Sequence, residues 1–94
     1  MESTNAFGEA LRSLRLRQGL SQQDFVRVVS REHLSRLERG VSQPNLQLIR
    51  DLAGVLGIHP ISLLAKAFER AGDASELRDL MVTIASDLGI DLDQ

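Results

Sequence analysis

The sequence predicts an all-α protein, and three observations carry that prediction. The large apolar residues recur at intervals of three and four, which gathers them on one side of a helix. No run of several residues alternates apolar and polar side chains as a half-buried strand does. The periodic segments are followed by glycines, the residue most favoured just after a helix: Gly19, Gly40, Gly57 and Gly72. The chain is therefore expected to fold as a series of short helices.

Three helices are expected in the first 40 residues. The first covers residues 6–18. The second follows the cap Ser21, and Asp24 three positions later has a spacing close to that of a capping box. The apolar side of this second helix is formed by Phe25, Val26 and Val29. The third helix is capped by Ser30 and runs to residue 39.

Two further helices are expected before residue 72. One opens at Pro44 and Asn45 and carries a 3.6-residue stripe of Leu46, Ile49, Leu52, Ala53 and Leu56. The next begins near Pro60, because proline is favoured at the first helical position, and it ends at about Ala71.

Residues 72–94 contain one more expected helix. Residues 73–76 have the spacing of a capping box, with Asp73 replacing the usual serine or threonine, and the helix then runs to about Leu88. We therefore divide the chain into a helical domain over residues 1–71 and a C-terminal helix with an acidic tail over residues 72–94.

The charge is distributed unevenly although the net charge is only −2. Residues 1–50 hold eight arginines and five acids, a balance of +3, whereas residues 51–94 hold three basic residues and eight acids, a balance of −5. A basic first half indicates a surface that meets nucleic acid. Arginine, which outnumbers lysine ten to one, favours bidentate contacts with phosphate or guanine, although a GC-rich genome explains that ratio equally well.

From the sequence, we do not expect several classes of function. There is no cysteine, and the two histidines cannot form a metal site alone, so no metal or other cofactor is expected. No nucleophile with a base and no phosphate-binding glycine loop is visible, which argues against an enzyme. We see no signal for a small-molecule ligand. Neither a signal peptide nor a stretch of ~20 apolar residues is present, so we expect a cytoplasmic protein without a membrane segment.

The segment over residues 30–40 is the most informative for function. Its expected helix has only two apolar residues, Leu34 and Leu37, and its other positions are mostly long hydrogen-bonding side chains. A helix held by so narrow a stripe is suited to insertion into the major groove of DNA, which is about 12 Å wide and displays a distinct pattern for each base pair. Sequence-specific binding of double-stranded DNA is therefore expected.

Four motifs extend this interpretation, namely LRSLRLRQGLSQ at 11–22, LSRLERG at 34–40, Pro44, and LAGVLGIHPISLL at 52–64. With them the chain resembles the phage-repressor-like helix-turn-helix family, also called the Cro-like family, over roughly residues 6–68. The resemblance implies a five-helix repressor-like domain whose motif covers about residues 21–40, followed here by the C-terminal helix.

The resemblance also implies roles for individual residues. The base-reading candidates are Arg31, Glu32, His33 and Arg36, with Arg36 the deepest. The phosphate candidates are Gln22, Ser35, Arg39, Ser42 and Gln43. Arg15 and Glu38 match a structural pair that fixes the third helix against the first.

Some of these roles have alternatives. Glu32 either accepts a hydrogen bond from cytosine or merely orients Arg36 four positions later. His33 either reaches the DNA or acts as a partly exposed spacer, and His59 is expected to have a local structural role. The motif is also two residues shorter than is usual in this family, so that either the second helix loses about half a turn or the turn after it is tightened. Asp24 and Arg27 are the positions most affected.

The C-terminal helix carries a further apolar stripe of Leu77, Leu80, Met81, Ile84 and Leu88. This stripe either covers the domain's own core or pairs with a second chain, and we favour a homodimer because an unpaired stripe would expose a large apolar patch. The expected function is a homodimeric repressor that binds an inverted-repeat operator, with half-sites one helical turn, about 34 Å, apart. The alternative is an antitoxin-like or anti-repressor module whose acidic second half binds a protein partner.

Overall fold

The computed structural model describes residues 5–72 and 76–91 and contains five α-helices and one short 3₁₀ helix. In chain order they are α1 (Ala6–Arg17), η1 (Gln22–Phe25), α2 (Arg31–Glu38), α3 (Leu46–Leu56), α4 (Pro60–Arg70) and α5 (Leu77–Asp87). Within the described ranges there is no strand, so the predicted all-α class is confirmed.

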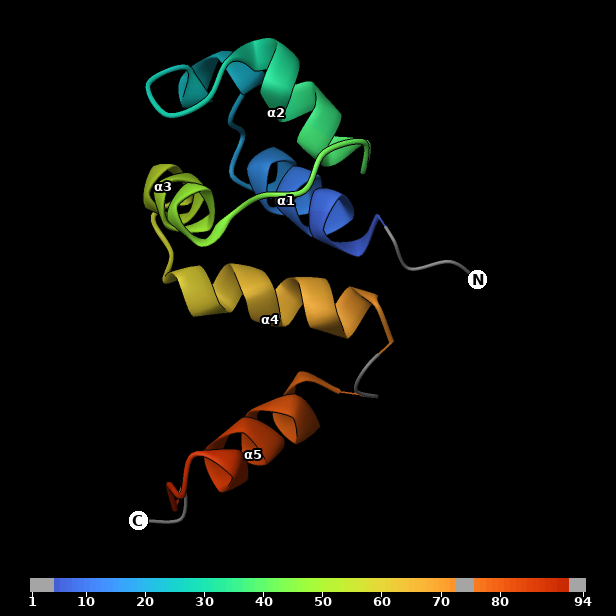
Figure 1. Cartoon of the computed structure of the whole chain (residues 1–94), viewed down its shortest axis with the longest axis vertical. Coiled ribbons are helices and arrows are strands. Elements are labelled where there is room, and N and C mark those ends of the chain that lie inside the picture. The colour runs from blue at the N-terminus through green and yellow to red at the C-terminus, as the bar shows by residue number, and fades with distance from the viewer. Residues whose placement is uncertain (1–4, 73–75, 92–94) are drawn as a thin grey trace.

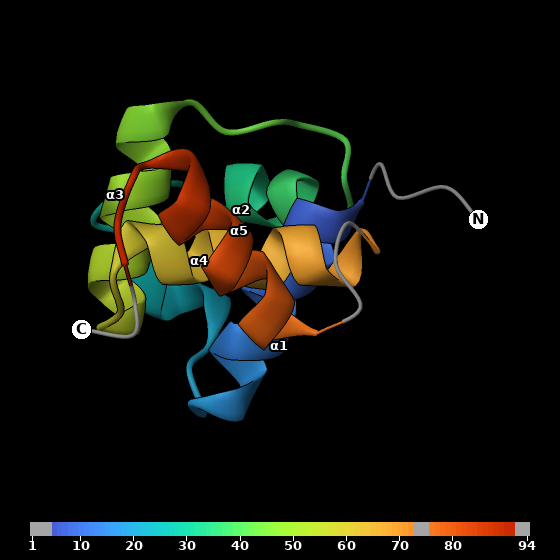
Figure 2. The ribbon, with the colours of Figure 1, turned by 90° about the horizontal axis from the view of Figure 1, so that it is seen from below.

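The helices lie in successive levels along the longest axis of the molecule (Figure 1). α2 and η1 occupy one end, α1 and α3 lie beneath them, α4 crosses under α1, and α5 forms the opposite end. α1 packs against both α2 and α4, which makes it the central helix of the domain. The view from below shows α5 crossing α4 on the side away from α2 (Figure 2). The two ends of the molecule are thus separated by the core.

The core is formed by side chains from all elements except α5. The fully buried large residues are Leu11, Phe25, Leu34, Leu37, Leu52 and Leu63. The predicted stripe of the fourth helix is buried at Ile49, Leu52, Ala53 and Leu56. Leu46 is the exception, because it stands at the first position of α3 and is 76% exposed.

Side-chain caps fix the starts of three helices. Ser30 Oγ accepts a hydrogen bond from His33 N at 3.0 Å, and Asn45 Oδ1 accepts one from Leu48 N at 2.8 Å. His59 Nδ1 accepts from Ile61 N at 3.0 Å, directly before the first helical residue Pro60. Each cap satisfies a backbone donor that the first helical turn leaves free.

The second expected helix is wrong as an α-helix. Ser21 and Asp24 do form the capping box, with Ser21 N donating to Asp24 Oδ2 at 2.7 Å, but only the 3₁₀ turn η1 follows and a non-helical turn leads to Ser30. Only eight residues separate the caps Ser21 and Ser30, too few for an α-helix and a reversal of the chain. Val26, expected on the apolar side, is 45% exposed, and the half-buried Val28 packs on the core instead.

α5 begins at Leu77, later than expected. Asp73 and the other residues of the expected capping box before Glu76 lie outside the described residues, as does the tail beyond residue 91. α5 packs on α4 and buries only Ala85, so the C-terminal helix adds little to the core of the domain.

No single helix in the described part of the chain is long and apolar enough to cross a membrane. α3 and α4 pass that test of length and composition only as a pair, and a bend of 101° separates them.

Candidate nucleic-acid interface

A buried polar joint fixes α2 against α1. Arg15 Nε donates to Glu38 Oε2 at 2.6 Å and Arg15 Nη2 donates to Glu38 Oε1 at 3.0 Å, while the two side chains are only 9% and 4% exposed. Arg15 Nη1 also donates to the carbonyl of Leu20 at 3.0 Å. A bidentate pair of hydrogen bonds between a guanidinium and a carboxylate has a fixed geometry. It therefore sets the orientation of α2 as well as its distance from α1.

Gln22 belongs to the same joint. Its Nε2 donates to Glu38 Oε1 at 3.3 Å, which turns the amide nitrogen of this predicted phosphate contact inward, toward the carboxylate. The amide oxygen is an acceptor and cannot bind a phosphate. The amide nitrogen carries a second N–H donor, which is not used by Glu38 and remains available for a phosphate.

The close approach of α1 and α2 also depends on Gly8, which was not among the predicted structural residues. A Cβ at this position would collide with the carbonyl oxygens of Leu37 and Glu38. Gly8 is buried in α1, and the missing side chain lets the C-terminal turn of α2 rest directly on the α1 backbone. A glycine inside a predicted helix was the signal that could have revealed it.

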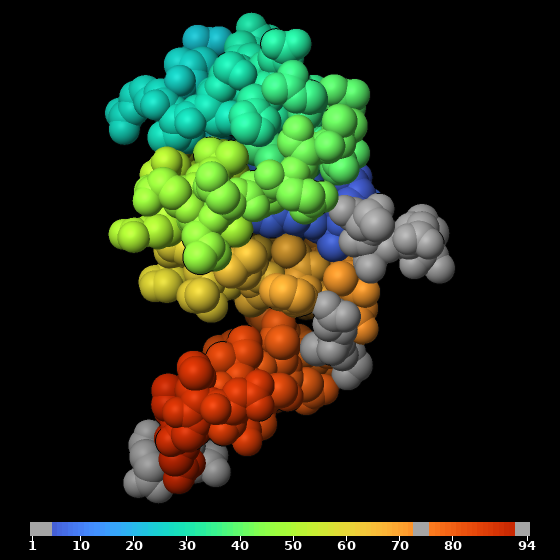
Figure 3. Space-filling view, viewed as in Figure 1, coloured from blue at the N-terminus to red at the C-terminus, as the bar shows by residue number. Residues whose placement is uncertain are grey.

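The outward side of α2 carries the predicted base-reading residues. Only Leu34, Leu37 and Glu38 of this helix are buried. Arg31 and Glu32 are exposed, whereas His33 and Arg36 are half-buried. No other part of the described chain lies over this end of the molecule in Figure 1, and α5 is at the far end of the surface in Figure 3. The helix is therefore free to meet a ligand.

Glu32 and Arg36 lie one helical turn apart and form an exposed ion pair. Arg36 Nη1 is 3.6 Å from Glu32 Oε2, and the side chains are 38% and 85% exposed. Solvent screening limits such a pair to about 0–1 kcal/mol. The pair thus orients Arg36 in the free protein and is weak enough for DNA to displace it, while the contact of Glu32 with cytosine stays a prediction.

The other phosphate candidates lie around the C-terminal half of α2. Arg39 Nε donates to Ser35 Oγ at 3.4 Å. Ser42 is held near the helix end because its backbone N–H donates to the Arg36 carbonyl at 3.3 Å, and the following Gln43 is exposed. Gln22 is separate from this group because it lies on η1.

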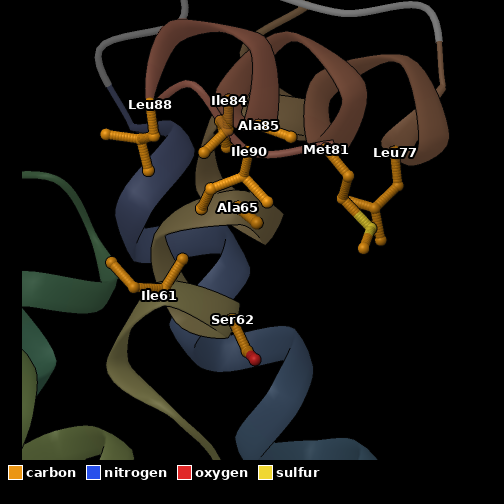
Figure 4. Close-up of a pocket in the computed structure, with 9 residues that line it drawn as sticks. All are labelled: Ile61, Ser62, Ala65, Leu77, Met81, Ile84, Ala85, Leu88 and Ile90. Carbon is orange, nitrogen blue, oxygen red and sulfur yellow. The ribbon is translucent and has the colours of Figure 1, made fainter. Parts of the chain in front are cut away.

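A second surface lies at the opposite end of the molecule. An apolar groove of about 350 Å³ runs between α4 and α5, and Figure 4 shows side chains from both helices directed into it. From α5 and the residues after it come Leu77, Met81, Ile84, Ala85, Leu88 and Ile90, and from α4 come Ile61, Ser62 and Ala65. Four of the five predicted dimer residues thus line the groove, whereas Leu80 does not.

Ile61 and Ala65 are two of the groove residues that sequence reasoning missed. They stand four positions apart on α4, a spacing that puts them on one face of the helix. Ile61 is 53% exposed. The described part of the chain holds no group of three or more metal-ligating side chains.

Comparison with known proteins gives two similarities. A helix-turn-helix family model matches residues 11–69, more than half of the chain. Among solved structures, the clp gene regulator ClgR from Corynebacterium glutamicum is similar, with 26% sequence identity and a TM-score of 0.70 over 93% of this chain and 95% of that chain. No curated protein sequence gives a significant match. The chain belongs to the phage-repressor-like helix-turn-helix family of DNA-binding transcription regulators.

Proposed function

We propose that the protein is a homodimeric transcriptional repressor that inserts α2 into the major groove of an inverted-repeat operator. The observation that carries the proposal is the outward side of α2, where Arg31, Glu32 and Arg36 stand on an uncovered helix. The buried joint of Arg15 and Glu38 supports it because it holds that helix in one orientation before DNA arrives.

The dimensions of the helix and of the groove match. An α-helix with its side chains is about 10–12 Å across, and the major groove is about 12 Å wide. Arg36 can offer its planar guanidinium to O6 and N7 of guanine, the commonest specific contact between proteins and DNA. Glu32, released from Arg36, can then accept a hydrogen bond from cytosine N4, and Arg31 and His33 reach neighbouring bases or phosphates.

The phosphate contacts would flank α2. Ser35, Arg39, Ser42 and Gln43 form one group, near the C-terminal half of the helix. Gln22 would form the second contact region through the amide N–H donor that Glu38 does not accept. Such contacts fix the register of the protein on the duplex, while the residues of α2 read the sequence.

Dimerisation would use the C-terminal element over residues 72–94, joined to the DNA-binding domain over residues 1–71. Leu77, Met81, Val82 and Leu88 are 40–68% exposed. Burying the exposed half of such a side chain contributes about 1 kcal/mol, so the residues from two copies together contribute several. A two-fold dimer would present two α2 helices to half-sites about 34 Å apart, and the bound protein would exclude polymerase.

The apolar groove also favours a second candidate, in which a foreign protein rather than a second copy covers α5. An antitoxin-like or anti-repressor module would use this surface together with the acidic second half of the chain. Light scattering after size-exclusion chromatography separates the two functions. A dimer of the purified chain supports the homodimer, whereas a monomer that assembles only with another protein supports the alternative.

Selection of bound duplexes from a random library tests the leading proposal. The expected product is an inverted repeat whose half-sites are one helical turn apart, because the two-fold axis of the protein imposes that symmetry. A single asymmetric site would contradict the two-fold arrangement, and failure to enrich any sequence would contradict sequence-specific binding.

A further inference from the structure

The turn that joins η1 to α2 is held rigidly at its base. The carbonyl oxygen of Phe25 accepts hydrogen bonds from the backbone N–H groups of Val28 and Val29, each at 3.0 Å. The side chains of Phe25 and Val29 are both buried, at 0% and 7% exposure, so each end of the turn is anchored in the core. The two residues that lie between Phe25 and the half-buried Val28 are therefore held in a fixed position and face outward.

Those two residues are Val26 and Arg27, and both are exposed. Among the residues that the structure describes, Arg27 makes no hydrogen bond or ion pair. The nearest acid in the sequence, Asp24, accepts from Ser21 N at 2.7 Å and from Ser21 Oγ at 3.2 Å. Arg27 thus offers an uncompensated guanidinium at the tip of a short, fixed turn.

The turn leads directly into the helix that is proposed to enter the groove. Arg27 precedes the cap Ser30 by three residues, which limits their Cα separation to about 11 Å. Because a helix about 10–12 Å across fills a groove about 12 Å wide, the chain that enters the helix must cross the row of phosphates bordering that groove. Figure 1 shows this turn, in teal, projecting from the same end of the molecule as α2.

We propose that Arg27 binds a DNA phosphate at the rim of the major groove, on the N-terminal side of α2. This contact rests on the proposed function and adds to it a phosphate contact that results from the shortened motif. Where a full second helix would hold the chain away from the rim, the tight turn brings an arginine to it. The contact is independent of base sequence, since phosphates carry no sequence information directly.

Salt dependence of binding tests the proposal. Arg27→Ala, Arg27→Lys and Arg12→Ala are compared with the unaltered protein on the selected operator duplex and on a random duplex, by fluorescence anisotropy. Arg12 is an exposed arginine on α1 and provides the matched control for the loss of one positive charge. Loss of one phosphate contact should lower the slope of log Kobs against log salt by about 0.9.

We expect that slope to fall for Arg27→Ala but not for Arg12→Ala. The advantage of the unaltered protein over Arg27→Ala should then shrink by about 3.5-fold between about 50 and about 200 mM salt, on both duplexes alike. Arg27→Lys should retain the slope because it keeps the charge, and Arg27→Gln, which removes the charge but keeps a long side chain, repeats the test if the alanine variant folds poorly.

Two results would overturn the contact. If Arg27→Ala is folded by circular dichroism and binds with the slope of the unaltered protein, the phosphate contact is wrong while the proposed function stands. If Arg27→Ala weakens operator binding alone and leaves the random duplex unaffected, Arg27 reads bases instead. Failure of the unaltered protein to bind any duplex would contradict the proposed function itself.

Discussion

Removing the carboxylate of Glu38 should destabilise the protein severely. Glu38→Ala leaves the guanidinium of Arg15, which is only 9% exposed, without the two hydrogen bonds at 2.6 and 3.0 Å that now neutralise it. Gln22 loses its acceptor in the same substitution. Breaking a buried pair by removing one partner costs about 3–5 kcal/mol, mostly because an uncompensated charge stays buried.

That cost is a large fraction of the total stability of a small domain, which is about 5–15 kcal/mol. At about 4–8 °C per kcal/mol for a domain of 60–100 residues, the melting temperature should fall by at least about 12 °C. Urea denaturation followed by circular dichroism gives the free energy of unfolding directly. The slope of the transition should change little if the native state keeps its compactness.

Glu32→Ala is the matched control for this prediction. Like Glu38→Ala, it removes a glutamate carboxylate from α2, but that carboxylate belongs to an ion pair at 3.6 Å and its side chain is 85% exposed. We expect a change below about 1 kcal/mol because solvent screens that pair. A loss for Glu38→Ala no greater than that for Glu32→Ala would refute the argument that the buried joint stabilises the fold.

A double substitution distinguishes two causes of the expected loss of stability: the lost attraction between the pair, and the burial of an uncompensated charge. Arg15→Met combined with Glu38→Ala removes the guanidinium as well as the carboxylate, and an apolar replacement of a buried pair is often nearly neutral. The double variant should therefore be more stable than Glu38→Ala alone. If the loss of stability in the double variant instead equals the sum of the losses in the two single variants, Arg15 and Glu38 do not act as a pair.

Three further substitutions test other parts of the molecule. Gly8→Ala should cost roughly 1–3 kcal/mol in urea denaturation, because the new methyl group collides with the Leu37 and Glu38 carbonyls, and unchanged stability would show that the helices separate freely. Arg36→Ala should weaken operator binding by about 1–3 kcal/mol and relax the preference at one base position; retention of the original ratio of operator to random binding would exclude base reading. Met81→Asp places a charge in the α4–α5 groove and should convert the proposed dimer into a monomer in light scattering, while a dimer that persists would locate the interface elsewhere.

Most helices could be predicted because their signals are local. Ser30, Asn45 and the pair of His59 and Pro60 each mark a helix start by hydrogen bonds or ring geometry that depend on a few neighbouring residues. The apolar stripe of α3 likewise follows from a period of 3.6. The resemblance of the sequence to its family also placed Arg15 and Glu38 opposite each other, and the structure has them in direct contact.

The failures arose where length or tertiary packing decides. The segment around Val26 was expected to be helical, but eight positions between two caps cannot hold both a helix and a reversal, so Val26 is exposed and the half-buried Val28 packs on the core in its place. The importance of Gly8 depends on a carbonyl oxygen from a helix about 30 positions away, which periodicity cannot report. Leu46 fits the stripe by spacing but lies at the helix end, where the turn that would cover it is missing.

In α2, different residues pack on the core and face outward, and this separation affects how new binding preferences can arise. The positions that anchor this helix, Leu34, Leu37 and Glu38, are distinct from the outward positions that include Arg31 and Glu32. Under the proposed function, substitutions at the outward positions can change the target site with little cost in folding, because the anchors stay unchanged. The same fold can thus carry different outward residues for different DNA sequences.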